Sequence, residues 1–324
     1  MLRTFAAGIG AVICGAVICA AAAWAQDGYP TRDVIIIVPL AAGSGTDIMA
    51  RVLASGLTEK LGKPFTVENR PSANGIPATE YVARQPADGY TLMLGDSTTH
   101  SANPNLFTTL KYDPIKDFTP IARLATAGAV LVVAPGTPYR SIADIVSEAK
   151  ADPGKLTYGS PNSGAQIAGE TIKTTAGVDI TRVPYRTTPE AMDDVTSGII
   201  TMTFVDVAAA LANVTNHRLR AIAITSAQRS VLLPDVPTMQ EQGFKGFNLT
   251  YWNGLFGPAP LPKEIVGILD RASGEIMGSP AMKETLSNLG LDASYLPAAE
   301  MPNYVATELD RWGVFVRDTG IEPN

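Results

Sequence analysis

An early stretch of the chain has a hydrophobic pattern that predicts a strand, a tight loop and a helix in succession. Val34–Val38 is a continuous run of β-branched residues, which is typical of a strand buried on both faces. Pro39 ends this strand, because proline cannot donate to a sheet ladder. Apolar residues then recur at helical spacing over Ile48–Leu61. The loop 40–45 between them contains two glycines, so a ligand could approach its backbone closely.

The start of this predicted helix has the properties of an anion-binding site. Ser44 or Thr46 can cap the helix, and Asp47 suits the positive end of its dipole. The backbone N–H groups of a first helical turn have no partner inside the helix, so they can bind a negatively charged group above the loop. We therefore expect the segment Leu40–Asp47 to form one wall of a site for a small anion.

Strand and helix patterns alternate through the rest of the chain. Short β-rich runs bounded by turn residues predict the strands, and apolar residues at helical spacing predict the helices. Such alternation predicts an α/β fold with parallel sheets and helices on both sides. The expected strands are 64–68, 90–94, 130–134, 155–159, 180–184, 199–205, 219–225 and 251–257, and the expected helices are 78–85, 141–151, 169–175, 189–195, 207–214, 262–277 and 301–319.

Three later strand ends carry loops of the same kind as the first. Asp96–His100, Ser160–Gly164 and Arg186–Thr188 are rich in hydroxyl groups or glycine, and each precedes a predicted helix. In open α/β sheets, ligands bind at the carboxyl ends of the strands. No flexible linker separates the two halves of the chain, so a strand must cross between them near 124–128. We expect two α/β domains with these loops facing each other across a cleft.

The first 25 residues have the pattern of a secretory signal peptide. Arg3 is followed by an uncharged apolar run, Phe5–Ala25, which ends in an A-x-A cleavage pattern. We expect cleavage after Ala25 and export to the periplasm. A permanent N-terminal anchor is the alternative, because the run is long enough to span a bilayer. Cys14 and Cys19 both lie in this segment, so the mature chain would have neither disulfides nor thiol chemistry.

The net charge excludes some classes of partner. Without the one arginine of the signal, 24 basic and 31 acidic side chains give the mature chain a formal charge of −7. This charge argues against nucleic acid and against an anionic membrane surface as partners. It does not exclude an anionic small ligand, because such a ligand responds to the local field of its site.

The sequence contains no assembled catalytic or cofactor motif. The loop 40–45 lacks the lysine of a P-loop, and Ile48 stands where a dinucleotide fingerprint needs its third glycine. No G-x-S-x-G nucleophile elbow occurs, and the S-x-x-K of Ser147–Lys150 lies in a predicted helix without the other motifs of its class. Only His100 and His217 are available for metal binding or acid–base work. We therefore expect a binding protein with no metal and no cofactor, and not an enzyme.

A series of short motifs follows one order along the chain. They are YPTRDVIIIVPLAAGSGTDIMAR, PADGYTLMLGDSTTHSANP, YDPIKDFTPIARLA, KLTYGSPNSG, VPYR, LRAIAITSAQRS and LPDVPTMQEQGF. On these motifs the chain resembles the substrate-binding receptors of tripartite tricarboxylate transporters, the Bug family of extracytoplasmic solute receptors. The resemblance implies a two-domain Venus flytrap of the type II periplasmic-binding class. It divides the chain into a signal peptide at 1–25, domain 1 at 28–126 plus 249–324, and domain 2 at 127–248.

The resemblance also implies a function. It predicts a monomeric periplasmic protein that captures a small aliphatic or aromatic carboxylate, largely through backbone groups and water, and delivers it to membrane permease subunits. The residues expected at the ligand come from the loops on the two sides of the cleft. They are Leu40, Ala41, Ala42, Gly43, Ser44, Gly45, Thr46, Asp47, Ser97, Thr98, Thr99, Ser160, Asn162, Ser163, Gly164, Gln166, Arg186, Thr187, Thr188 and Asp206.

Some of these positions depart from the pattern of the family. Pro39–Ser44 reads PLAAGS where members often read PFPPGG, and Gln166 stands in place of a common histidine. Tyr185–Thr187 reads YRT where YKG is usual, and its Arg186 could face a carboxylate or point to solvent. These departures leave the identity of the ligand open.

Two other functions fit the same sequence. One is a sensor subunit that presents a bound ligand to a signalling receptor, and the other is an exported α/β hydrolase or transferase that uses the same cleft. The missing nucleophile elbow, cysteine and metal ligands count against the enzyme. The sequence does not separate transport from signalling.

Overall fold

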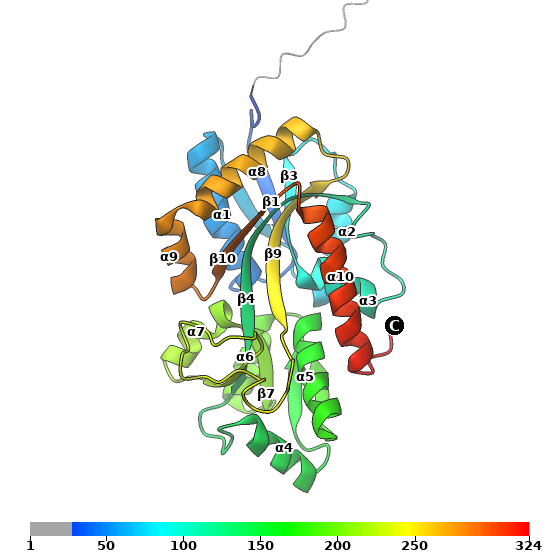
Figure 1. The fold of residues 1–324 in the computed structure, drawn as a ribbon, viewed down its shortest axis with the longest axis vertical. Coiled ribbons are helices and arrows are strands. Elements are labelled where there is room, and N and C mark those ends of the chain that lie inside the picture. The colour runs from blue at the N-terminus through cyan, green and yellow to red at the C-terminus, as the bar shows by residue number, and fades with distance from the viewer. Residues whose placement is uncertain (1–27, 324) are drawn as a thin grey trace, which may run out of the picture.

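The computed structural model describes residues 28–323, so the expected signal peptide lies outside the described part. These residues form two α/β lobes, drawn one above the other in Figure 1. Lobe 1 is built on a sheet with the strand order β2-β1-β3-β9-β4, and β10 pairs with the other edge of β4. Its strands are β1 (Val34–Val38), β2 (Phe65–Asn69), β3 (Thr91–Asp96), β4 (Phe118–Val133), β9 (Thr250–Pro258) and β10 (Asp292–Pro297).

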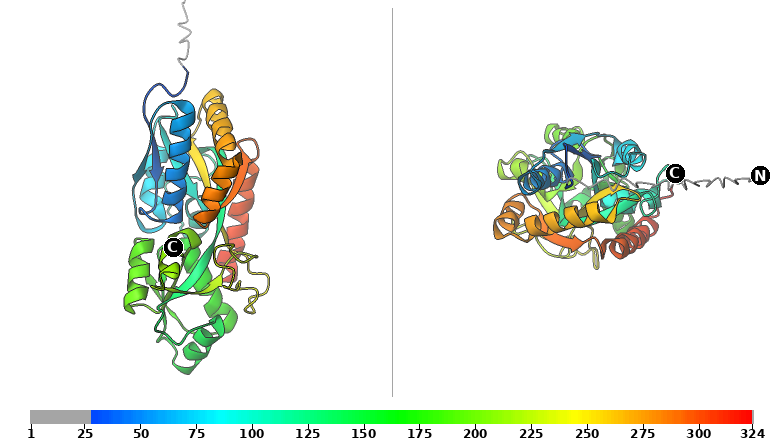
Figure 2. Two further views of the ribbon diagram at one scale, coloured as in Figure 1. Left: turned by 90° about the vertical axis from the view of Figure 1, so that its left-hand side faces the viewer. Right: turned by 90° about the horizontal axis from the view of Figure 1, so that it is seen from above.

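Helices cover both faces of the sheet in lobe 1. Val34, Ile36 and Val38 of β1 point into one buried cluster, and Ile37 points into another on the opposite face. Figure 2 shows α1 and α8 side by side over the first of these clusters. The helices of this lobe are α1 (Gly45–Leu61), α8 (Lys263–Gly278) and α9 (Pro280–Asn288) on one face, and α2 (Ile76–Ala83) and α10 (Met301–Asp318) on the other.

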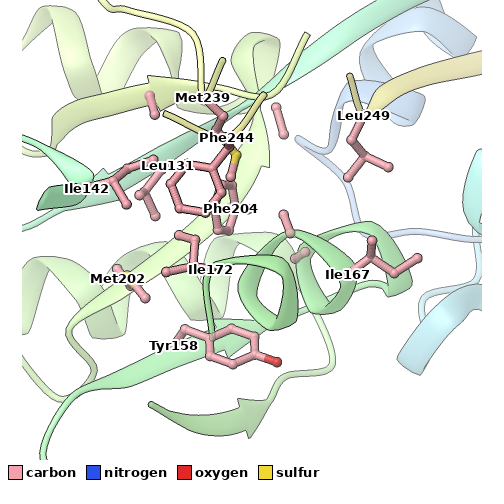
Figure 3. Close-up of a cluster of buried hydrophobic side chains, with 14 of the residues drawn as sticks. Leu131, Ile142, Tyr158, Ile167, Ile172, Met202, Phe204, Met239, Phe244 and Leu249 are labelled. Atoms are coloured by element: carbon pink, nitrogen blue, oxygen red, sulfur yellow. The ribbon is translucent and has the colours of Figure 1, made fainter. Parts of the chain in front are cut away.

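Lobe 2 repeats the arrangement around the end of β4. Its sheet has the order β6-β5-β7-β4, and β8 also pairs with β4. Figure 3 shows Leu131, Phe204 and Ile172 packed together between this sheet and α5. The elements are β5 (Thr157–Ser160), β6 (Thr181–Pro184), β7 (Met202–Asp206), β8 (Arg220–Ile224), α4 (Ile142–Ala151), α5 (Ser163–Ala176), α6 (Thr188–Ser197) and α7 (Val207–Thr215).

The strand β4 belongs to both sheets. It pairs with β9 over 118–128 and with β7 over 129–133, and each pairing is antiparallel. The expectation of parallel sheets is therefore correct for β1–β3 and for β5–β7 but wrong for the strands that cross between the lobes. A crossing strand enters its second lobe at the cleft, so it runs against the strands of that lobe that end there, β4 against β7 and β9 against β3. The two-domain α/β architecture itself is confirmed.

The helix α10 connects the two lobes. Met301 and Val305 at its start lie in a core of lobe 1, whereas Trp312 and Val316 near its end belong to the core of lobe 2. The ring of Trp312 lies 6.0 Å from that of Tyr251, within the range of favourable aromatic pairs. Every helix in residues 28–323 is too short or too polar to span a bilayer.

Candidate ligand-binding cleft

A nearly closed cavity lies between the lobes, where the carboxyl ends of β1, β3, β5 and β7 meet. The gaps between its lining atoms add up to about 320 Å³, but the space open to solvent-sized molecules is only about 10 Å³. That space holds about one water molecule. The structure therefore shows the lobes in a closed arrangement. The lining residues are Gly45, Thr46, Asp96, Thr98, Ala127, Asn162, Asp206, Tyr251, Asn253 and Leu291.

Two other hollows have far more space open to solvent-sized molecules than the roughly 10 Å³ of this cavity, and both lie away from these strand ends. One, of about 210 Å³, lies between α5, the loop 244–247 and the end of α10. The other, of about 350 Å³, lies between the loop 226–231 and the end of α9. Both are more open to solvent than the cleft. Position at the strand ends, and not size, identifies the interlobe cavity as the candidate site.

The loop before α1 is held by its own polar side chains. Ser44 caps the helix by accepting a hydrogen bond from the N–H of Asp47, at 3.2 Å. The carboxylate of Asp47 accepts from the N–H of Gly43 at 2.9 Å, and it forms an ion pair with Arg51 at 3.0 Å. Burial alone would raise the pKa of Asp47, but the hydrogen bonds from Arg51 and Gly43 hold it below its usual value. Asp47 therefore shapes the loop and does not line the cavity.

Asn69, at the end of β2, completes this support. Its Nδ2 donates to Oδ1 of Asp47 at 2.9 Å and to the carbonyl oxygen of Leu40 at 3.1 Å. The side chain of Leu40 is buried in the core of lobe 1, whereas Ala42 and Gly43 are exposed. The groups of this loop that reach the cavity are thus at its helical end, Gly45 and Thr46.

A chain of hydrogen bonds forms the wall of the cavity in lobe 1. Oγ1 of Thr46 donates to Oδ2 of Asp96 at 3.0 Å and accepts from Nδ2 of Asn253 at 3.1 Å. The N–H of Thr99 donates to Oδ1 of Asp96 at 3.0 Å. Burial raises the pKa of Asp96 in spite of these bonds. A buried carboxyl group is therefore a fixed part of this wall.

The wall in lobe 2 contains a second carboxyl group. Oδ2 of Asp206, at the start of α7, accepts a hydrogen bond across the cleft from the N–H of Gly45, at 3.3 Å. Burial, and then the nearby charge of Asp96, raises the pKa of Asp206 to about 6. Asn162 lines the same wall and caps α5 by accepting from the N–H of Ala165 at 2.9 Å.

A second set of hydrogen bonds joins the lobes beside the cavity. Oγ of Ser163 lies 3.1 Å from Oδ1 of Asn74 and 2.9 Å from Oδ1 of Asn103. The amide of Asn103 also donates to the carbonyl oxygen of Asn74 at 2.8 Å. Ser163 lies at the start of α5 in lobe 2, and both asparagines belong to lobe 1. These contacts add to the closed arrangement without reaching the cavity.

The close approach of the lobes requires a glycine at position 164. A Cβ atom there would lie 2.3 Å from the ring of Tyr251, which is closer than real Cβ contacts. Tyr251 lies on the crossing strand β9 and lines the cavity. Gly164 thus lets α5 pack directly against that strand.

Several expected site residues lie near the cleft but have other partners. Ser97 accepts a hydrogen bond from the N–H of Trp252 at 2.9 Å, and Thr99 bonds to Asp96 and His100. Ser160 accepts from Nε of Arg182 at 2.9 Å. None of the residues in the following list lines the cavity in the described structure: Leu40, Ala41, Ala42, Gly43, Ser44, Asp47, Ser97, Thr99, Ser160, Ser163, Gly164, Gln166, Arg186, Thr187 and Thr188.

The last four of these have other surroundings. Gln166 lines a separate hollow with Asn74 and Arg182. Arg186 is exposed, and Thr187 caps α6 by accepting from the N–H of Glu190 at 3.3 Å. Thr188 is buried at the first position of α6.

The cavity also contains residues that the sequence analysis did not select. The loop that begins at Asp96 was expected at the site, but Asp96 itself was not among the residues expected at the ligand. Asn253 is a polar side chain in an otherwise apolar strand, which is a signal that could have found it. Tyr251 is both buried and part of the lining. Ala127 and Leu291 carry no chemical signal in the sequence.

The two-lobed fold, with a cavity at the strand ends, defines a class of extracytoplasmic binding proteins. The R. palustris protein Rpa4515, solved with adipate, is similar to this chain, with a TM-score of 0.89 and 33% identity over 92% of this chain and 100% of that one. The periplasmic binding protein BugD has a TM-score of 0.86 and 28% identity, and covers 91% of this chain and 100% of its own. MatC from Rhodopseudomonas palustris, solved with malate, has a TM-score of 0.83 and 29% identity, and covers 89% of this chain and 100% of its own.

The sequence comparisons agree with these structures. A family model described as the tripartite tricarboxylate transporter family receptor matches residues 49–321. The protein BugT from Bordetella pertussis is 32% identical over 303 residues, which are 93% of each chain. The chain belongs to the tripartite tricarboxylate transporter receptor family. This result confirms the resemblance inferred from the sequence motifs.

Proposed function

We propose that this protein is a periplasmic receptor that captures a small carboxylate between its lobes and delivers it to the permease subunits of a tripartite transporter. The observation that carries this proposal is the first turn of α1, whose residues Gly45 and Thr46 line a cavity shared by both lobes. A helix N-terminus favours a negatively charged group. Related proteins solved with adipate and with malate support a carboxylate as that group.

Binding would follow from hydrogen bonds that replace water around the carboxylate. The N–H groups of α1, the hydroxyl of Thr98 and the amide groups of Asn162 and Asn253 are available at the cavity wall. Each hydrogen bond to a charged group contributes about 1.5–3 kcal/mol net of lost hydration. A ligand of the expected size needs more room than one water, so the lobes must separate to admit it and close around it.

We propose that the hinge of this motion lies in the crossing strands. We propose that the lobes correspond to domain 1 at 28–126 plus 249–324 and domain 2 at 127–248, with β4 and β9 bending between them. The permease would recognise the closed form. The expected export signal, cleaved after Ala25, and a monomeric state belong to the same proposal.

We propose that the protein binds its ligand without converting it. Among residues 28–323, no group of three or more His, Cys, Asp or Glu side chains is placed to hold a metal ion. The family consists of receptors. The buried His100 bonds to Thr99 and stacks on Phe256, away from the cavity lining.

Titration calorimetry with adipate, L-malate, benzoate and acetate tests the proposal. We expect one of these acids to bind with a stoichiometry of one and to be recovered unchanged after prolonged incubation. The same acid should raise the melting temperature, because it binds only the folded state. If none of the four binds at any accessible pH, or if the bound acid is converted, the receptor proposal fails.

A further inference from the structure

The carboxyl group of Asp206 does not have the partner that its position predicts. Asp206 is the N-cap residue of α7, where an aspartate side chain normally accepts from the N–H groups of its own helix. No such bond forms. The carboxyl group instead crosses the cleft and accepts from the N–H of Gly45, the first residue of α1. Asp206 thus leaves its own helix α7 uncapped and caps α1 of the other lobe. Its side chain is therefore positioned to act in the cleft.

This contact fills the place that the ligand is proposed to take. The N–H of Gly45 points to Asp206, and the N–H of Thr46 has no acceptor in the described part of the chain. These are the donors that the first turn of α1 offers to the cavity. A Cβ at position 45 would lie 3.0 Å from the Asp206 carboxyl, so this group sits directly on the helix start. In the closed cleft, the protein's own carboxyl group occupies the carboxylate position.

Within the described chain, no group that faces Asp206 could balance the negative charge that a ligand carboxylate would add to the cleft. Asp96 on β3 is the charged group that acts on Asp206, and the phenol of Tyr251 on β9 is neutral, with a pKa that burial raises well above the usual value. On α1, Asp47 is paired with Arg51. The helix α7 carries no charged side chain of its own, and the lining contains neither Lys, Arg nor His. A ligand carboxylate would therefore meet two acidic groups and no cation.

We propose that Asp206 takes up a proton when the ligand binds and donates it, as an O–H group, to the ligand carboxylate at the start of α1. The inference rests on the proposed function, because it concerns the same site. Two carboxyl groups in contact in a buried site favour one shared proton, since both cannot be ionised without strong repulsion. The proton comes from solvent and stays on Asp206 while the ligand occupies the N–H groups of Gly45 and Thr46.

The protonation of Asp206 in the closed cleft without a ligand fits this role. Burial and the charge of Asp96 raise its pKa to about 6, so the group is ready to accept a proton near neutral pH. Above that value, binding must include proton uptake, and the apparent affinity falls about tenfold for each pH unit. Between about pH 6 and about pH 8, the dissociation constant should thus rise roughly 50-fold.

The test is calorimetric titration of adipate, L-malate and benzoate into the wild-type protein and into Asp206→Asn. The carboxyl groups of these acids are mainly ionised from about pH 6 to about pH 8, so the ligand itself adds little pH dependence. Titrations at about pH 8 in two buffers of different ionisation enthalpy count the protons taken up. The matched control is Asp193→Asn, which changes an exposed aspartate on α6. Melting curves establish that both variants are folded.

We expect the wild type and Asp193→Asn to take up about one proton per ligand at about pH 8 and to bind roughly 50-fold more weakly there than at about pH 6. Asp206→Asn should bind with one affinity at both pH values and without proton uptake, because its amide is a permanent donor. Equal wild-type affinities at both pH values without proton uptake would overturn the inference and leave the receptor function standing. Loss of binding by folded Asp206→Asn would also overturn the inference, because it would show that Asp206 accepts a hydrogen bond from the ligand and does not donate one. If no acid binds the wild type at either pH, the receptor function itself is wrong, and the inference falls with it.

Discussion

The hydroxyl of Ser163 in lobe 2 lies 2.9 Å from Oδ1 of Asn103 in lobe 1. The same hydroxyl is 3.1 Å from Oδ1 of Asn74, and it has one proton, so it donates to one of the two amides at a time. Neither asparagine nor Ser163 lines the cavity. This hydrogen bond therefore stabilises the closed arrangement independently of what the cavity contains.

Replacing Ser163 with alanine should weaken every ligand by the same factor. The closed form would lose one buried hydrogen bond, worth about 0.5–1.5 kcal/mol, or about 2- to 13-fold in affinity. Calorimetry with two acids of different size measures this factor. Ser197→Ala, which removes an exposed hydroxyl bonded to its own helix, should leave affinity unchanged. A loss that differs strongly between the two acids would show that Ser163 contacts the ligand itself.

Gly164→Ala should disturb the cleft through Tyr251. The new Cβ would lie 2.3 Å from that ring, which lines the cavity, so the ring must move. We expect the free energy of unfolding to fall by about 1–3 kcal/mol and the ligand affinity to fall by more than tenfold. Gly169→Ala is the matched control, because its Cβ would lie 2.4 Å from Tyr158 inside lobe 2. It should lower stability to a similar degree and leave affinity intact; equal affinity losses in both variants would contradict this account.

Thr46→Val tests the wall in lobe 1. Valine keeps the shape but removes the hydroxyl that donates to Asp96 and accepts from Asn253. Both buried groups lose a partner, so the free energy of unfolding should fall by about 1–3 kcal/mol, and ligand affinity should fall with it. Chemical denaturation and calorimetry measure the two effects. Thr215→Val, at an exposed hydroxyl bonded only within α7, should change neither, and an unaltered affinity in Thr46→Val would move the site elsewhere.

The buried His100 should make the protein sensitive to acid. Burial lowers its pKa to about 3, below the usual value of 6.5. Between these two pH values the unfolded chain binds one more proton than the folded chain, so stability falls as the pH falls, by about 1.4 kcal/mol per pH unit. Denaturation at a series of pH values should show a shallower loss for His100→Leu than for the wild type. His217→Asn, at an exposed left-handed position, should keep the wild-type slope. If His100→Leu also keeps that slope, His100 is not the source of the acid sensitivity.

The local patterns of the sequence predicted most elements well. The β-branched run at Val34–Val38 and the amphipathic stripe after it are strong signals, and β1 and α1 confirm them. The first residues of β4, 118–123, were missed, because bulges at Pro120 and Arg123 interrupt the alternation. The helix α9 was missed because Leu286 is its one buried residue, so it has no apolar stripe.

The site was predictable at the level of loops but not of side chains. Strand ends and glycine-rich turns predicted loops that surround the cavity between the lobes. Which polar groups point into it depends on contacts across the chain, which no local pattern records. Ser44 and Asp47 were expected at the ligand, yet their hydrogen bonds hold the loop. Asp96 lines the cavity because Thr46, 50 residues away, orients it.

The pairing of β4 with β9 restricts how specificity can be exchanged between relatives. These strands carry the chain out of lobe 1 and back, and at the crossing Ala127 lies opposite Tyr251 and Gly128 opposite Thr250. A slip of one residue in a strand turns every side chain to the opposite face. A chimera that transplants lobe 2 from another receptor must therefore join both strands at paired positions. A graft joined in register would keep Tyr251 at the cavity. A graft shifted by one residue in β9 would put a residue next to Tyr251 at the cavity instead.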